Sequence, residues 1–69
     1  MNAKETAVLR NWLKLDTAGR VNVLKKNRMK QVRGGWYDKE LEVHCTSIGQ
    51  ALEYLLKTYA TGELKLTKI

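Results

Sequence analysis

The chain has no proline and no phenylalanine, and its 69 residues include one cysteine and one histidine. Its large core side chains must therefore come from leucine, valine, isoleucine, tyrosine and the two tryptophans. A single cysteine forms no internal disulfide and no cysteine-rich metal site, and it fits a reducing, cytoplasmic setting. No apolar run approaches the ~20 residues that a membrane span needs. Lys4, Glu5 and Arg10 interrupt the N-terminus before the apolar segment of a signal peptide forms.

The length of the chain, residues 1–69, predicts a single small domain. A domain of this size buries only ~60% of its unfolded surface, so dimerisation is a natural way to bury more. A helix is predicted after Ser47, and Tyr54 and Leu56 fall beside its main apolar stripe. We expect any homodimer contact at these two residues.

Two stretches carry clear helix signals. Ser47 precedes Gln50 by three residues, which is the spacing of a capping box, and Gly62 is the expected stop of that helix. The apolar residues that follow Ser47 at helical spacing are Ile48, Ala51, Leu52, Leu55 and Tyr59. Near the N-terminus, Asn2 and Glu5 show the same spacing and predict a first helix over residues 2–15. Trp12 is expected in its buried face.

Residues 20–45 allow two interpretations. A second helix would place Arg28 within its apolar face and leave Val23 outside it. Strands suit the stretch better, with turns at residues 26–27 and 34–35, because consecutive glycines provide the positive φ angles of a tight hairpin. Leu41, Val43 and Cys45 alternate with polar residues, which is typical of a half-buried strand.

The strand interpretation predicts a definite register. A turn at Gly34 and Gly35 pairs Arg33 with Trp36 on the solvent side and Val32 with Tyr37 on the buried side. The buried face would carry Val21, Val23, Val32, Tyr37, Leu41, Val43 and Cys45. The predicted fold is therefore α+β: an N-terminal helix, a small antiparallel three-stranded meander and a capped C-terminal helix. Leu64 and Leu66 alternate with polar residues and allow a short final strand.

The positive charge is concentrated in one stretch. No Asp or Glu occurs between Thr17 and Tyr37, and elsewhere seven basic residues balance seven acidic ones, so this stretch accounts for the net charge of +6. Such a patch attracts polyanions and gains affinity by releasing counterions from phosphates. The candidate nucleic-acid-binding residues are Arg20, Lys25, Lys26, Arg28, Lys30 and Arg33, together with an exposed Trp36 that would stack on a base.

The leading hypothesis is a nucleic-acid-binding protein in a regulatory or accessory role that uses this basic hairpin. One alternative is an inhibitor or adaptor that docks the hairpin on an acidic protein, and another is a structural homodimer subunit. His44 is expected on a polar strand face, and Cys45 is expected to be a small buried hydrophobe. No residues group into a catalytic, metal or cofactor site, so we expect a non-enzyme. The layout is similar to that of many small proteins of phages and other mobile elements.

Overall fold

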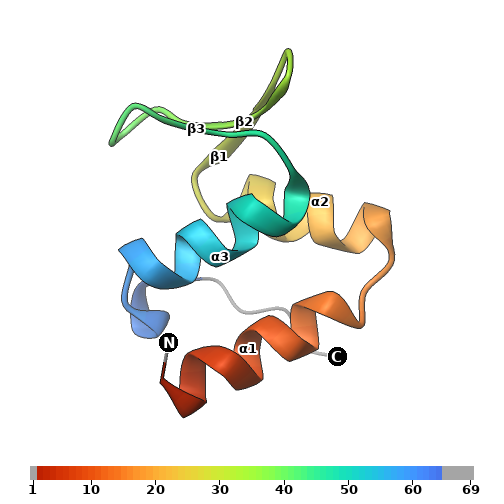
Figure 1. Cartoon of the computed structure of the whole chain (residues 1–69), viewed down its shortest axis with the longest axis vertical. Coiled ribbons are helices and arrows are strands. Elements are labelled where there is room, and N and C mark those ends of the chain that lie inside the picture. The colour runs from red at the N-terminus through yellow and green to blue at the C-terminus, as the bar shows by residue number, and fades with distance from the viewer. Residues whose placement is uncertain (1, 65–69) are drawn as a thin grey trace.

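The computed structural model describes residues 2–64 (Figure 1). Its elements, in chain order, are α1 (Ala3–Leu13), α2 (Thr17–Lys26), β1 (Met29–Val32), β2 (Gly35–Asp38), β3 (Val43–Cys45), α3 (Ile48–Thr58) and a 3₁₀ turn (Thr61–Glu63). The strands form one antiparallel sheet in the order β1-β2-β3. The fold is therefore α+β with a three-stranded meander, as the sequence predicts.

Side-chain caps begin all three helices. The Asn2 side chain accepts from the backbone N–H of Glu5 at 2.8 Å, and the Ser47 hydroxyl accepts from the N–H of Gln50 at 3.1 Å. Both of these caps were expected. The cap of α2 was not: the Asp16 side chain accepts from the N–H of Gly19 at 2.8 Å. Each cap satisfies a backbone donor that the first helical turn leaves without a partner.

All three helices lie on one side of the sheet, and α3 lies between the sheet and α1 (Figure 1). Helix α2 packs against β1 and against α3. The hydrophobic core fills the space between these layers. Its most buried members are Trp12, Val23, Leu24, Met29, Trp36, Cys45, Ala51, Leu52, Leu55 and Leu56. Trp12 and Cys45 are therefore core residues, as the sequence predicts.

The first predicted strand, over residues 20–25, is wrong because this segment belongs to α2. Two features made a helix look unfavourable. Val23 is fully buried because α2 is covered by neighbours on more than one side. Arg28 does not lie in the helix face, because α2 ends at Lys26 and Arg28 takes a left-handed backbone conformation with φ of 76°. The predicted turn at residues 26–27 is therefore the end of a helix.

The hairpin turn lies one position before the predicted one, and the pairing of the two strands is shifted by two residues. Val32 pairs with Gly35 and Gln31 with Trp36, so the turn lies at residues 33–34. A shift of two residues leaves the same side chains together on each face of the hairpin, so the prediction was also wrong about which face packs on the helices. The face that carries Trp36 packs against the helices, so Trp36 is 3% exposed and lies in the core, whereas the sequence predicted it at the surface. Tyr37, predicted to face inward, lies on the opposite face from Trp36.

Two other boundaries differ from the expected ones. The predicted strand around Leu41 starts only at Val43, and Leu41 is 50% exposed in the preceding turn. Helix α3 ends at Thr58 instead of Gly62, because Tyr59 turns into extended backbone and buries its ring. The possible final strand extends into residues 65–69, which lie outside the described part of the chain.

The neighbouring residues Gly34 and Gly35 have different surroundings, and we expect their alanine variants to differ in stability. A Cβ on Gly35 would lie 2.0 Å from the carbonyl oxygen of Cys45, whereas a Cβ on Gly34 meets no atom within 4 Å. Gly35→Ala should lower the free energy of unfolding by about 3 kcal/mol, since the strands must separate. Gly34→Ala should lower it by only about 1 kcal/mol, through backbone strain at φ 87°. Urea unfolding of both variants checks this, and equal losses would contradict the observed register.

Candidate nucleic-acid interface

The face of the sheet that points away from the helices carries one row of side chains across all three strands. Lys30 lies opposite Tyr37, and Tyr37 lies opposite His44. Residues directly opposite each other share a face, so this row points away from Trp36, Asp38 and the helices. Lys30 and His44 are exposed and Tyr37 is half-buried. The row thus places an aromatic ring on the central strand with a lysine on one side and an imidazole on the other.

This open face is free of negative charge along its strands. Asp38 is the only acidic residue in β1, β2 and β3, and it points to the helices. Arg33 occupies the turn between β1 and β2, and Lys25 and Lys26 close α2 shortly before β1 begins. A lysine or arginine side chain on this face therefore has no strand carboxylate that would compete with a phosphate for it.

Four of the predicted site residues are exposed and make no ion pair or side-chain hydrogen bond with any residue from 2 to 64. They are Lys25, Lys26, Lys30 and Arg33. These four side chains are available to a polyanion without losing an internal contact. The structure gives the other three predicted residues internal positions or partners.

Arg20 is one of those three. Its Nη2 donates to the carbonyl oxygen of Leu13, the last residue of α1, at 2.7 Å. Its Nε is buried and has no hydrogen-bond partner within the described residues. The guanidinium satisfies a carbonyl at the end of α1, so Arg20 joins α1 to α2.

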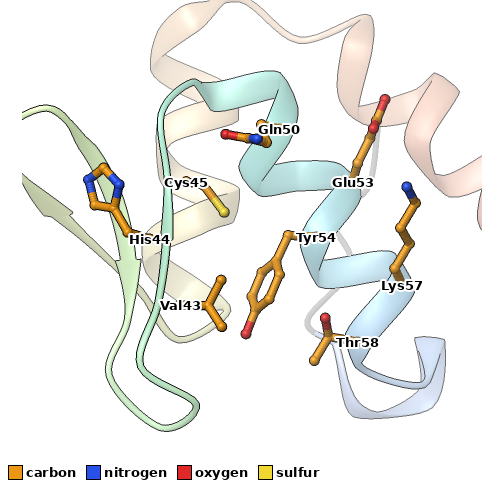
Figure 2. Close-up of a pocket in the computed structure, with 8 residues that line it drawn as sticks. All are labelled: Val43, His44, Cys45, Gln50, Glu53, Tyr54, Lys57 and Thr58. Atoms are coloured by element: carbon orange, nitrogen blue, oxygen red, sulfur yellow. The ribbon is translucent and has the colours of Figure 1, made fainter.

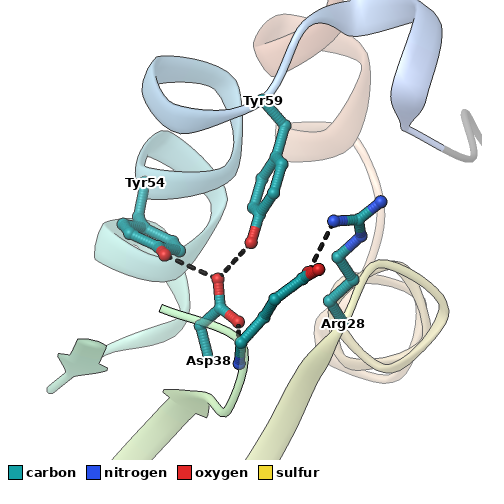
Figure 3. A network of polar contacts seen from close by, with 5 residues as sticks. Arg28, Asp38, Tyr54 and Tyr59 are labelled. Carbon is teal, nitrogen blue, oxygen red and sulfur yellow. Dashed lines mark hydrogen bonds and ion pairs between the residues drawn. The ribbon is translucent and has the colours of Figure 1, made fainter. Parts of the chain in front are cut away.

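Arg28 and Trp36 are the other two. The Arg28 guanidinium lies 4.6 Å from the centre of the Tyr59 ring, and its Nη1 lies 2.6 Å from Oε2 of Glu40. Figure 3 shows the Arg28 side chain extending away from the strands, with its guanidinium near the Tyr59 ring. Trp36 is enclosed in the core, so the predicted stacking of a base on its ring would require the sheet to open.

Asp38 is the buried centre of a polar network that sequence reasoning missed (Figure 3). It is 0% exposed. Its Oδ2 accepts from the hydroxyls of Tyr54 at 2.6 Å and Tyr59 at 2.5 Å, and its Oδ1 accepts from the backbone N–H of Glu40 at 3.0 Å. The network holds the central strand to α3 and to the residue that ends it.

The network shifts the pKa values of its members. Burial raises the pKa of Asp38, but the hydrogen bonds from Tyr54, Tyr59 and backbone N–H groups outweigh burial, so this pKa lies below its ordinary value. Burial and the hydrogen bond to Asp38 raise the pKa of Tyr54 and of Tyr59. At neutral pH Asp38 is therefore the charged acceptor and both tyrosines are neutral donors.

An open hollow of about 400 Å³ lies between β3 and α3 (Figure 2). Figure 2 shows the Tyr54 ring between the two elements and the His44 ring turned away from it. Burial and the charge of Asp38 raise the pKa of the Cys45 thiol, which keeps it protonated and weakly nucleophilic. Within residues 2–64, no three His, Cys, Asp or Glu side chains lie close enough to hold a metal ion.

The predicted dimer contact is not supported at Leu56, which is 2% exposed in the core. Tyr54 is half-buried, and its hydroxyl is bonded to Asp38. The helices of the described chain are too short and too polar for any of them to cross a membrane.

Comparisons of the chain with protein families, with curated proteins and with solved structures find no match.

The Asp38 network predicts a specific pH dependence of stability. Because the folded pKa of Asp38 lies below its unfolded value of about 3.9, its contribution is complete above that pH and is lost as the pH falls through the folded pKa. The raised pKa values of Tyr54 and Tyr59 act at the other end, where stability falls as the pH rises above about 10.

The Asp38→Asn variant tests the predicted loss of stability at low pH. It should lower the free energy of unfolding at pH 7 by about 2–3 kcal/mol, because hydrogen bonds to a charged acceptor are lost. The substitution should lower the free energy of unfolding less as the pH falls below about 4, because the wild type loses the same charge there. Urea unfolding at a series of pH values measures both curves. Parallel curves for the two proteins would contradict the assignment of a charged Asp38.

Proposed function

We propose that the protein binds nucleic acid in a regulatory or accessory role, through phosphate contacts from Lys25, Lys26, Lys30 and Arg33. The observation that carries the proposal is the state of these side chains: all are exposed, and none is paired within residues 2–64. They follow one another along the end of α2, β1 and the hairpin turn. Unpaired cations beside strands whose one carboxylate, Asp38, is buried release counterions from phosphates with little internal cost.

The distribution of charge supports the same proposal. The stretch from Thr17 to Tyr37 contains six basic residues and no acidic one. Two of the six, Arg20 and Arg28, hold internal partners, which leaves the remaining four for a ligand. Phosphate contacts of this kind position a nucleic acid without reading its bases. We therefore propose binding that tolerates different base sequences. We also propose a reducing compartment such as the cytoplasm, where Cys45 stays a thiol.

A charge-removal experiment with a matched control tests the proposal. Lys25→Ala, Lys26→Ala and Arg33→Ala are combined in one variant, and Lys4→Ala, Arg10→Ala and Lys14→Ala in another. Both remove two lysines and one arginine from exposed positions, but the control removes them from α1 and its end, which lie beyond α3 from the sheet (Figure 1). Neither change should alter stability by more than ~0.5 kcal/mol per residue.

Binding of fluorescent DNA and RNA oligonucleotides is measured across a range of salt concentrations. The first variant should weaken binding about equally for all base sequences, because three phosphate contacts are lost. It should reduce the slope of log affinity against log salt by about 2 for single strands and by about 3 for duplex DNA. The α1 variant should keep most of the wild-type slope. Equal slopes in the two variants would place the interface elsewhere. Absence of wild-type binding at low salt would overturn nucleic-acid binding and favour an acidic protein partner.

A further inference from the structure

The three tyrosines of the chain divide into two kinds. The hydroxyls of Tyr54 and Tyr59 donate to Asp38, and their rings contact each other edge-on with centres 6.4 Å apart. Tyr37 has no hydrogen bond, ring contact or cation contact with any residue from 2 to 64. It is a half-buried ring on the open face of the sheet, where no described helix covers it (Figure 1). The internal contacts that explain the other two tyrosines are therefore missing at Tyr37.

The surroundings of Tyr37 suit a flat, negatively charged ligand. Lys30 and His44 lie directly opposite it on the neighbouring strands, and neighbouring strands are about 4.8 Å apart. Arg33 follows at the hairpin turn, at the end of the strand that carries Lys30. A nucleotide joins a flat base to a charged phosphate, so a base over Tyr37 leaves its phosphates within reach of these cations.

We infer that Tyr37 stacks an unpaired base, so that the ligand of this surface is single-stranded nucleic acid. The inference rests on the proposed function and narrows it to one class of ligand. In a duplex the neighbouring base pairs cover the faces of each base, and a protein reaches only base edges and the backbone. A ring on an open sheet face between cations therefore discriminates in favour of unpaired strands. DNA and RNA single strands share this chemistry.

The test compares four fluorescent probes with equal numbers of phosphates per strand, each about 12 nucleotides long to match common single-strand site sizes. They are oligo-dT, oligo-rU, a mixed-sequence DNA duplex and an abasic DNA strand that keeps its phosphates but has no bases. Fluorescence anisotropy gives the affinity of each probe for the wild type and for Tyr37→Leu, Tyr37→Phe and Lys30→Ala. Circular dichroism melting checks that each variant folds.

Tyr37→Leu should weaken binding of the preferred single strand by about 5- to 150-fold, as for the loss of one stacked base. It should change duplex and abasic binding by less than about threefold, and Tyr37→Phe should stay within about threefold of wild type on every probe. Lys30→Ala should weaken all four probes because it removes a phosphate contact. The dT and rU arms identify which kind of strand the surface prefers.

Unchanged single-strand affinity in Tyr37→Leu, or an equal loss on the duplex, would overturn the inference while leaving phosphate binding intact. If no probe binds the wild type, the proposed function fails as well. If Tyr37→Leu does not fold, the abasic probe decides with the wild type alone: it should bind about 5- to 150-fold more weakly than oligo-dT or oligo-rU. Equal wild-type affinity for the abasic and the base-carrying strands would overturn the inference.

Discussion

The buried carboxylate of Asp38 is the interaction on which the sheet and its two faces depend. A charge with no exposure to water must be hydrogen-bonded, and its side-chain donors, Tyr54 and Tyr59, come from α3 and its end. Asp38 must therefore face the helices. Because side chains alternate along a strand, this places Trp36 inward and Tyr37 outward. The core and the open face thus follow from one constraint on β2.

The same network explains the unusual backbone around it. Tyr59 ends α3 and buries its ring where its hydroxyl reaches Asp38. Arg28 adopts a left-handed conformation that is unfavourable for a residue with a side chain, and its guanidinium lies over Tyr59 and pairs with Glu40. The ends of α2 and α3 and the turn after β2 therefore meet at one cluster.

The features that the sequence predicted correctly are mostly local ones. The caps at Asn2 and Ser47 depend on residues three positions apart, and the alternation before Cys45 indicates a strand that buries it. The register of β1 and β2 could not be found this way, because either glycine of the pair 34–35 suits a tight turn. The deciding contact joins Asp38 to Tyr59, twenty-one residues further along the chain. The basic stretch was visible in the sequence, but the partner that engages Arg28 lies twelve residues away.

Nuclear Overhauser effects between the strands test the central claim, the register of β1 and β2, most directly. The structure predicts cross-strand contacts from backbone protons of Lys30 to Tyr37 and of Gln31 to Trp36, and from Tyr37 to His44. Contacts from Val32 to Tyr37 and from Arg33 to Trp36 would contradict it. They would place Val32 instead of Lys30 opposite Tyr37, and would therefore take the lysine out of the row on which the proposed base-stacking surface depends.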